Sequence, residues 1–244
     1  MNLTEFKVVR RGYIPDDKKF FKNENLAKVK KAALEISFLI NRGYNIKNAS
    51  TFVGNHYLLS ERQRLFLARA LSSKKDIESR HLKELTLDDL KGENISIDGF
   101  NTIITLETAL SNSMIFKGED NTIRDLAGLR GTYKIIDKTI HALKLIFDSL
   151  NEFQIKRVEF YLDKPVSNSG RLKELIIYMS KDYNFETEVF LIEAVDSLLE
   201  KKEYVISSDA IILNKCISWF NLNAYIINKK IQEVFCIDIF PLSY

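Results

Sequence analysis

The stretch ENISIDGFNTIITLETAL, residues 93–110, joins a strand pattern directly to a helix pattern. Ile95 and Ile97 alternate with polar residues as far as Asp98, which is typical of a β-strand. The segment TIITLETAL, which begins at Thr102, then continues into a helix. Because strands separated by helices form βαβ units, this stretch predicts the start of a mostly parallel sheet with helices on both faces.

Strand and helix patterns keep alternating through residues 93–244. Further strands are expected in KRVEFYLD (156–163), ETEVFLI (186–192) and EYVISSD (203–209), and NAYIIN (223–228) and VFCIDIF (234–240) are expected to finish the sheet. Helices are expected from about Tyr133 to Phe153 and in RLKELIIYMSKDY (171–183), AVDSLLEKK (194–202) and AIILNKCISWF (210–220). A polar loop is expected over residues 116–131. This order predicts an α/β fold with a mostly parallel, doubly wound sheet.

Residues 1–92 are predicted to form a small all-helical domain in front of this sheet. An amphipathic helix begins at Glu24, and Asn48 can cap a second, short helix. Ser60 and Gln63 form the capping-box pattern Ser-x-x-Gln at the start of a third helix, SERQRLFLARALSS. This order is similar to a helix-turn-helix, although the same outline also serves as a packing module.

The charge of the chain is distributed unevenly. Residues 1–92 hold 19 Lys or Arg and 11 Asp or Glu, a net charge of +8, whereas residues 93–244 hold 17 and 22, a net charge of −5. Such a division indicates a basic surface for a polyanion such as nucleic acid, and simple solvation of Lys-rich helix faces is the alternative. In the third helix, Arg62, Arg64 and Arg69 are candidates for the outer, nucleic-acid-binding surface. Its packing face is predicted to consist of Leu65, Leu67, Ala68 and Leu71.

Composition excludes several classes of protein. With 45% hydrophobic and 28% charged residues and a net charge of +3, the 244-residue chain is not a long disordered segment. No uncharged apolar run approaches the roughly 18 residues of a membrane helix, and the N-terminus lacks the apolar region of a secretory signal. Two cysteines, Cys216 and Cys236, are too few for a disulfide framework, and His56, His81 and His141 share no metal-ligand spacing. We therefore expect a protein of the reducing cytoplasm, without a membrane partner.

Carboxylates occur where the predicted strands end. The first strand ends at Asp98, the second at Asp163 and the fourth at Asp209, and Asp196 opens the helix that follows the third. The carboxyl ends of such strands lie along one edge, where ligands bind, so we expect these side chains to meet. Carboxylate oxygens suit Mg²⁺ or Mn²⁺, which can activate water for attack on a phosphodiester. For any single Asp, a role as a helix cap or turn former is the alternative.

Three motifs in this half resemble those of a known superfamily. SIDGFNTII (96–104) is similar to the first-strand motif of the PIN-like nuclease superfamily, especially its NYN-type branch, in which Asp-Gly-x-Asn follows a hydrophobic strand. EAVDSLL (193–199) resembles its helix-opening segment with a metal-binding Asp, and YVISSDAIIL (204–213) resembles its later strand ending in Ser-x-Asp. The resemblance covers about residues 93–230. The whole chain, with its helical front end, also resembles uncharacterised archaeal proteins.

The resemblance implies particular roles for the residues that match the motifs. Asp98, Asp196 and Asp209 would be the catalytic, metal-linked acids, and Asn101 would orient the loop after the first strand or contact a phosphate. The chain departs from the superfamily at Ile211, where a second acid is often found. This departure favours an alternative in which the PIN-like fold serves as a noncatalytic binding or scaffold module.

Further candidates lie in the helix and the loop after the first strand. Glu107 follows Asp98 by nine residues and would reach the same edge as a metal ligand if its helix starts early; a solvent-facing glutamate is the alternative. Arg124 and Arg130 lie in the loop 117–130, which would fold over substrate and bind phosphates bidentately, or would be only a surface connection.

The segment KPVSNSG, before the helix at 171–183, offers another candidate phosphate site. Ser167 and Asn168 precede helical amides that can bind a phosphate, and Arg171 adds positive charge nearby. Ordinary N-capping explains the same residues equally well.

Together these patterns predict a nuclease that hydrolyses RNA with Mg²⁺ or Mn²⁺ bound by Asp98, Asp163, Asp196 and Asp209, assisted by Glu107. Residues 1–92 would bind the nucleic acid, and assembly as a homodimer is left open. The alternatives are a noncatalytic module and a phosphohydrolase of small substrates. Against the phosphohydrolase, Phe100 stands where a second Asp would follow Asp98 by two residues.

Overall fold

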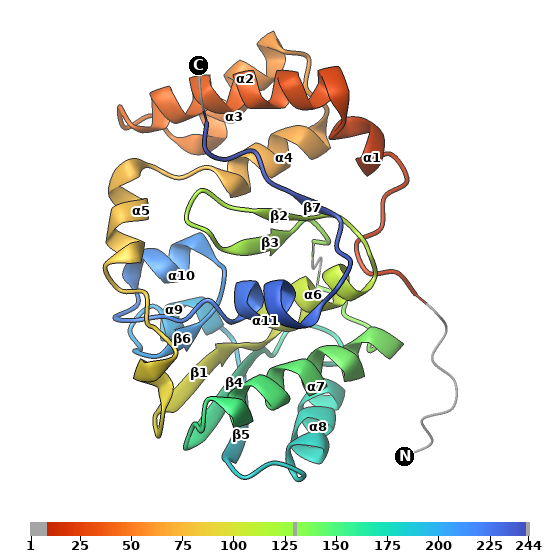
Figure 1. The fold of residues 1–244 in the computed structure, drawn as a ribbon, viewed down its shortest axis with the longest axis vertical. Helices are drawn as coiled ribbons and strands as arrows, with labels where there is room; N and C mark the ends of the chain where they lie inside the picture. Colours follow the sequence, from red (N-terminus) through yellow and green to blue (C-terminus); the bar gives the residue numbers. More distant parts are fainter. Residues whose placement is uncertain (1–8, 129–130, 243–244) are drawn as a thin grey trace.

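The computed structural model describes residues 9–128 and 131–242, and its elements are arranged as in Figure 1. The strands are β1 (Asn94–Asp98), β2 (Ile115–Lys117), β3 (Ile123–Asp125), β4 (Arg157–Asp163), β5 (Glu186–Ile192), β6 (Val205–Ile206) and β7 (Cys236–Ile237). The α-helices are α1 (Asp17–Phe20), α2 (Asn23–Ile40), α3 (Ile46–His56), α4 (Glu61–Ala70), α5 (Lys74–His81), α6 (Gly99–Leu110), α7 (Asp137–Glu152), α8 (Ser169–Ser180), α9 (Val195–Leu199), α10 (Ala210–Lys215) and α11 (Leu222–Lys230). A 3₁₀ turn, η1 (Asp88–Leu90), precedes β1. Among these described residues, no helix combines the length and apolar character needed to cross a membrane.

Four strands form a parallel sheet in the order β5-β4-β1-β6. The chain moves outward from β1 to β4 and β5, and then crosses to the opposite side of β1 to add β6. The direction of winding therefore reverses between β1 and β6. In sheets of this kind the ligand crevice lies beside that reversal, at the carboxyl ends of the strands.

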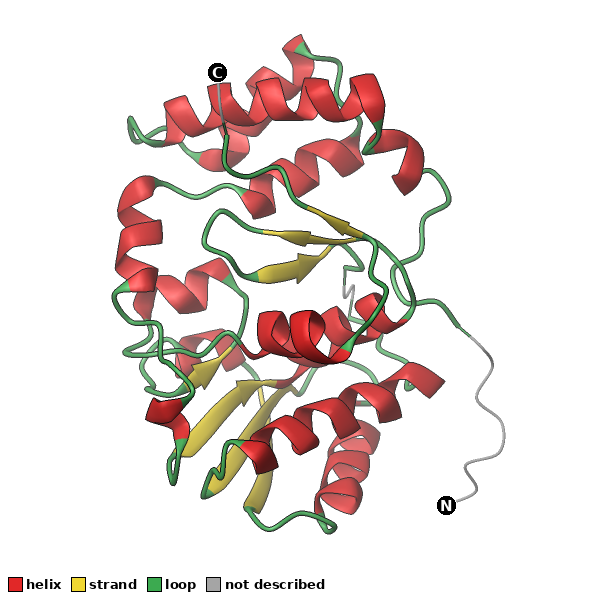
Figure 2. Ribbon diagram, viewed as in Figure 1, coloured by secondary structure: helices red, strands yellow, loops and turns green. Residues whose placement is uncertain are grey.

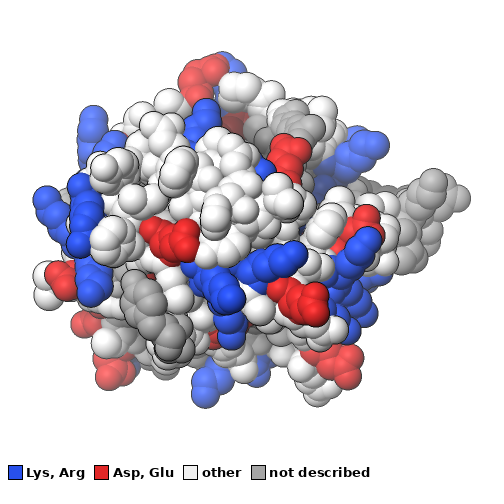
Figure 3. Space-filling model, turned by 90° about the horizontal axis from the view of Figure 1, so that it is seen from above, with Lys and Arg blue, Asp and Glu red and all other residues white. Residues whose placement is uncertain are grey.

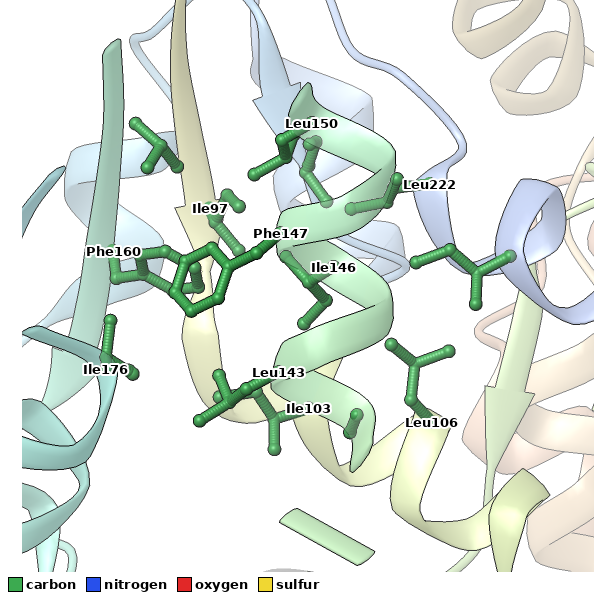
Figure 4. Close-up of a cluster of buried hydrophobic side chains, with 14 of the residues drawn as sticks. Ile97, Ile103, Leu106, Leu143, Ile146, Phe147, Leu150, Phe160, Ile176 and Leu222 are labelled. Carbon is green, nitrogen blue, oxygen red and sulfur yellow. The ribbon is translucent and has the colours of Figure 1, made fainter. Parts of the chain in front are cut away.

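Helices cover both faces of the parallel sheet, as the alternation of strands and helices predicted (Figure 2). Phe160 of β4 packs in one core cluster with Ile97 of β1 and with Phe147 of α7 (Figure 4). The next residue, Tyr161, belongs to another cluster, together with Val195 of α9 and residues of α10. Because successive strand residues point to opposite faces, α7 and α8 cover one face, and α9 and α10 cover the other.

A second sheet, with the order β3-β2-β7, lies between the parallel sheet and the N-terminal helices (Figure 1). Its strands β2 and β3 form an antiparallel hairpin within the segment predicted as a polar loop, so that prediction is wrong. The strand from VFCIDIF is β7, which pairs with β2 and not with the parallel sheet. β2 and β3 have three residues each, which leaves too little alternation of polar and apolar residues to reveal the hairpin.

The segment NAYIIN forms the helix α11 and not the predicted strand. Ile226 and Ile227 are both buried there, in the cluster that also contains residues of α6 and α7. Two consecutive apolar residues fit either a buried strand or a helix between two others, so the pattern did not distinguish the two.

Side chains cap the N-termini of α3, α4 and α5, whereas α1 and α2 begin without a side-chain cap. Ser60 and Gln63 form the predicted capping box of α4. The cap of α3 is Asn45, whose side chain accepts from the amides of Lys47 and Asn48, so the prediction of Asn48 as the cap is wrong. Asn45 satisfies amides that would otherwise lack partners at this helix end.

The N-terminal helices and the second sheet share one hydrophobic cluster. Phe66 of α4 lies edge-on to Phe116 of β2, with ring centroids 5.1 Å apart, and Ile36 of α2 and Ile237 of β7 belong to the same cluster. Residues from both ends of the chain therefore enclose the hairpin. The division into domains at residue 92 stays a prediction.

A buried ion cluster joins the hairpin to the helices around it. Asp120, fully buried in the β2–β3 turn, forms ion pairs with Arg80 of α5 and Arg124 of β3, both of which are 2% exposed. Arg80 also donates to the side chain of Asn214 in α10, and Arg124 Nε donates to the Ser208 carbonyl at 2.7 Å. Burial alone would raise the pKa of Asp120, but the two guanidinium groups lower it to about 2.

Removing the charge of Asp120 should strongly destabilise the protein. The substitution Asp120→Asn leaves Arg80 and Arg124 buried without a counter-charge, so we expect a loss of about 3–5 kcal/mol in the free energy of unfolding, measured by denaturant titration. The exposed pair Lys164–Glu193 provides the control, and Glu193→Gln should cost less than about 1 kcal/mol. Equal effects of the two substitutions would show that Asp120 is not the structural link described here.

Candidate functional site

Four predicted carboxylates meet in one pocket of about 410 Å³ at the carboxyl edge of the parallel sheet. The pocket is lined by Asp98, Asp163, Asp196 and Asp209, the four residues that were expected to converge there. The pocket lies where the direction of winding reverses. Asp98 is the last residue of β1, and Asp209 lies just after β6, the strand on the other side of the reversal.

Strand geometry explains why these side chains share one face. Asp98 is opposite Tyr161 in the β1–β4 register, and Tyr161 faces α9 and α10. Asp163 is two residues further along β4, so it lies on the same face. Asp196 lies in the first turn of α9, and Asp209 caps α10 by accepting from two backbone amides. Two strand ends and two helix starts therefore supply the four carboxylates.

Two serines fix the carboxylates at the β1–β6 junction. Ser207 Oγ donates to Asp98 Oδ2 at 2.8 Å and accepts from the Asp209 amide at 3.0 Å. Asn101 Oδ1 accepts from both the amide and the hydroxyl of Ser208, each at 2.9 Å. The Asp-Gly-x-Asn and Ser-x-Asp motifs are therefore bonded to each other across the reversal of the sheet.

Gly99 is required by the close approach of β4 to the start of α6. A Cβ atom at this position would lie 2.5 Å from a side-chain carbon of Leu162 and 3.1 Å from the Tyr161 carbonyl oxygen. Glycine thus lets the chain turn into α6 directly after Asp98, and this turn leaves the Asp98 carboxylate at the N-terminus of the helix.

Asp98, Asp163 and Asp196 are desolvated in the pocket, and neighbouring carboxylates repel Asp98 and Asp196. Burial raises the pKa of Asp98 to about 7, against the hydrogen bond from Ser207, and the charges of Asp209 and Asp196 add to the rise. The pKa of Asp196 is raised by burial and then by Asp209 and Asp163, and burial also raises that of Asp163. The arrangement is costly when no cation is present, and perturbed carboxylates in a cleft are typical of functional sites.

Two further residues in the pocket come from elements that the sequence did not connect to it. Arg69 of α4 lines the pocket, and its Nη1 donates to the Asp125 carbonyl at 2.6 Å. The Asp125 side chain also lines the pocket but accepts from Thr105 Oγ1 and the Ala127 amide. Asp125 is the last residue of β3. An acidic residue at a strand end is the same pattern that identified Asp98, but the hairpin was not predicted, so Asp125 was missed.

The donor atoms suit a hard cation, but the described residues do not form a complete metal centre. Carboxylate oxygens are the ligands that Mg²⁺ and Mn²⁺ prefer. Within residues 9–128 and 131–242, no three His, Cys, Asp or Glu side chains stand close enough together to hold a metal ion as they are. Binding would therefore require the carboxylates to turn toward one another once a cation offsets their repulsion.

Glu107 does not reach this pocket, so its prediction as a metal ligand is wrong. Its fully buried carboxylate pairs with Arg11 Nε at 2.7 Å and accepts from the hydroxyls of Tyr133 and Thr139. Burial raises the pKa of Glu107, against the effect of Arg11. The residue thus connects the N-terminal segment to α6 and α7.

Most of the predicted nucleic-acid-binding arginines bind within the protein. Arg62 pairs with the buried Asp17 and donates to the Leu126 carbonyl, while Arg64 donates to the carbonyl of Leu59 and to a side chain of α3. The prediction that they lie on the outer surface of α4 is therefore wrong.

The reason lies in how α4 is rotated about its axis. Phe66 is fully buried whereas Leu65 is 44% exposed, so the packing face is displaced from the predicted one. This rotation turns Arg62 and Arg69 toward the hairpin segment, where they donate to the carbonyls of Leu126 and Asp125.

The other predicted phosphate-binding residues lie in the β2–β3 hairpin, in the segment after it and in the KPVSNSG segment. Arg124 is buried in the ion cluster, so it does not bind phosphates, and Arg130 lies outside the described residues. The Ser167 hydroxyl accepts from the Tyr133 amide, and Asn168 Nδ2 donates to the Tyr133 carbonyl at 2.6 Å. Ser167 and Asn168 therefore hold the chain before α7, and their prediction as phosphate ligands is not supported by these contacts.

Arg171, in the first turn of α8, is exposed to solvent. Its assignment as a nucleic-acid-binding residue therefore stays a prediction.

Comparisons with known proteins place the chain in a family. It is 40% identical over 185 residues to the uncharacterized protein MJ0935 of Methanocaldococcus jannaschii, and the match covers 76% of this chain and 88% of that protein. A family model described as a domain of unknown function, DUF5616, matches residues 87–225. The chain belongs to this family. A second model, described as a protein of unknown function, DUF434, matches residues 28–83, and no solved structure matches the chain.

The DUF5616 match spans all four pocket aspartates that follow the parallel strands, whereas Arg69 lies within the DUF434 match. The pocket is therefore built from both matched segments of the chain.

The pH dependence of stability should reveal the buried carboxylate of Asp98. Its pKa is about 7 in the folded protein and 3.8 ordinarily, so folding takes up a proton between about pH 4 and pH 7. The contribution of the Asp98 carboxyl group to the free energy of unfolding is fully present below pH 4 and is lost as the pH rises toward 7. We therefore expect the difference in the free energy of unfolding between Asp98→Asn and the parent to shift in favour of the variant by about 2–4 kcal/mol as the pH rises from 4 to 8. The measurement is a denaturant titration without added metal.

The asparagine retains an oxygen that can accept from the Asn101 amide, so the cap of α6 is preserved, and its NH₂ group takes the place of Oδ2, where it can donate to the Ser207 hydroxyl. A stability difference that stays constant from pH 4 to pH 8 would contradict the raised pKa of Asp98. A large destabilisation of Asp98→Asn at all pH values would instead assign Asp98 a structural role.

Proposed function

We propose that this chain is a divalent-metal-dependent nuclease that hydrolyses RNA phosphodiester bonds. The observation that carries the proposal is the meeting of Asp98, Asp163, Asp196 and Asp209 in one pocket at the reversal of a parallel sheet. A volume of about 410 Å³ is sufficient for part of a nucleotide chain, and the mutual repulsion of the carboxylates favours a cationic ligand.

Mg²⁺ or Mn²⁺ held by these four aspartates would supply a bound water of lowered pKa and neutralise charge on the leaving oxygen. The chain itself contributes the orientation of the acids. Ser207 holds the Asp98 carboxylate, and Asn101 holds Ser208, so Asn101 acts as a positioning group for the loop before Asp209. In this proposal Asp98, Asp196 and Asp209 are the catalytic acids.

Arg69 is the phosphate-binding residue in this proposal. It lines the pocket from the side opposite the parallel sheet, and one hydrogen bond from Nη1 to the Asp125 carbonyl fixes its guanidinium group. Arginine offers five N–H donors, so further donors are available for a phosphate oxygen. Among the described residues of the lining, Arg69 is the one cation beside the carboxylates, and it would attract the phosphodiester without neutralising the metal ligands.

The assignment of the substrate as RNA draws on the resemblance to the PIN-like superfamily. The Asp-Gly-x-Asn and Ser-x-Asp motifs on which the resemblance rests are hydrogen-bonded to each other at the pocket. The proposal also places the protein in the cytoplasm, and both cysteines in the structure are free thiols.

The N-terminal helices contribute to binding less directly than predicted. Figure 3 looks onto the end of the molecule that carries α2 and α3, where Lys and Arg side chains are dispersed among Asp and Glu. We therefore propose that these helices act mainly by placing Arg69 at the pocket.

A metal titration tests the proposal without requiring an identified substrate. Mn²⁺ should raise the melting temperature of the protein according to the ratio of its concentration to its dissociation constant, and the rise should fade at low pH as the carboxylates become protonated. The double variant Asp98→Asn/Asp209→Asn should lose the rise, since asparagine preserves both helix caps but removes two charges. Cleavage of RNA, followed on gels, should be lost in the same variant.

Glu107→Gln is the matched control, because it neutralises a buried carboxylate outside the pocket. It should lower the melting temperature without metal and leave the Mn²⁺ response intact. A Mn²⁺ response that persists in the double variant would show that the metal binds elsewhere. Metal binding without cleavage of RNA or DNA would favour the noncatalytic module or the small-substrate phosphohydrolase.

The salt dependence of RNA binding should distinguish the phosphate-binding role of Arg69 from the structural role of Arg62 on the same helix. Arg69→Gln removes one phosphate contact, so the slope of log affinity against log salt should fall by about one. Arg62→Gln should leave the slope unchanged and reduce stability, since it leaves Asp17 buried without its partner. An unchanged slope in the Arg69 variant would restrict Arg69 to packing.

A further inference from the structure

A second cavity of about 420 Å³ lies beside the aspartate pocket, and we call it the side groove. Its walls come from the α2–α3 connection, α4, α5 and α10. The apolar and aromatic residues that line it are Ile40, Tyr44, Ile46, Ala68, Leu71 and Ile211. Their surface differs in character from the acidic aspartate pocket.

At two separate places, neighbouring residues of the chain line the side groove and the aspartate pocket. On α4, Ala68 lines the groove and Arg69 lines the pocket. At the start of α10, Asp209 lines the pocket whereas Ala210 and Ile211 line the groove. Because consecutive Cα atoms are about 3.8 Å apart, the two cavities adjoin between α4 and α10.

Two large side chains in the groove are exposed in a way that packing does not explain. Tyr44 is 61% exposed and Ile211 is 55% exposed. Ile211 occupies the position at which the PIN-like motif often carries a second acid, and in this chain its side chain belongs to the groove. An exposed aromatic ring beside an apolar side chain is a surface on which a planar ring can stack.

We propose that the side groove binds the base of the nucleotide next to the scissile phosphate. The inference rests on the proposed function, which places that phosphate between the aspartates and Arg69. A strand that leaves the pocket between α4 and α10 brings its next base to Tyr44 and Ile211. The base must be unstacked to enter, so the substrate class is single-stranded RNA.

The adjacency of the aspartate pocket and the side groove favours a nucleotide over a protein segment. The groove holds polar groups beside its apolar wall, among them Ser73, Asp76 and Asn214. Asp76 accepts from the Ser73 hydroxyl, and Asn214 accepts from Arg80, so these groups are held in place at the rim. A base presents an apolar face for the wall and a polar edge for such a rim.

Binding of single-stranded RNA with abasic sites tests the inference. Affinities are measured by fluorescence anisotropy with Ca²⁺, on strands shown by gel to stay intact, with one abasic nucleotide moved along the strand. Tyr44→Ala should weaken binding of the complete strand about tenfold, and Tyr44→Phe should preserve it. At one abasic position the Tyr44→Ala variant should show no further loss, because the stacking partner is already absent.

Tyr178 of α8 is the matched control, since it is also 61% exposed but is not a groove residue. Tyr178→Ala should bind all strands as the parent does. If Tyr44→Ala weakens every abasic strand as much as the complete strand, or has no effect on any, the inference is overturned and the proposed function stands. If the parent protein binds no RNA at all, both fail.

Discussion

Asp120 lies between Arg80 and Arg124 at a point where the hairpin, α5 and the loop before α10 come together. The hydrogen bond from Arg124 to the Ser208 carbonyl extends this ion cluster to the end of β6. Ser208 in turn donates to Asn101, at the start of α6. The position of the aspartate pocket therefore depends on a charge in a turn that belongs to neither the parallel sheet nor its helices.

Such a buried cluster is costly to form, because three ionised side chains lose their hydration on folding. Its cost is offset only when every donor and acceptor is satisfied, and Thr122 and Ser72 provide further hydrogen bonds to Asp120 and Arg80. Gly118 leaves the space that the cluster needs, since a Cβ there would lie 2.6 Å from Arg124 Nη1. A hydrophobic replacement would fill the volume but would lose the directional contact to Ser208, which keeps the β6 end in register with α6.

The parallel sheet could be predicted from the sequence because the pattern that reveals each of its strands lies within that strand. Strands of five and seven residues, such as β1 and β4, show alternation, and the rule that carboxyl ends share an edge is then enough to bring the four aspartates together. The serine hydrogen bonds, the winding order and the role of Gly99 depend on which strands lie side by side. Local patterns carry no information on that order, so these features could not be predicted.

The errors over Glu107, Arg62 and Arg69 concern residues whose partners are distant in the chain. Glu107 has helical spacing from Asp98 in its favour, but its position is determined by Arg11, 96 residues earlier. The arginines of α4 were placed on the wrong face because Phe66 packs against Phe116 of a hairpin that the sequence pattern did not reveal.

The rotation of α4 by its aromatic core has a functional consequence. With Phe66 buried, Arg69 lies in the aspartate pocket, and Ala68 lines the side groove. A helix whose arginines faced outward would leave the described lining of the pocket without a Lys or Arg, and its carboxylates would repel a phosphodiester as well as one another. In the proposed function, the packing of Phe66 against the hairpin therefore determines how a phosphodiester would meet this acidic site.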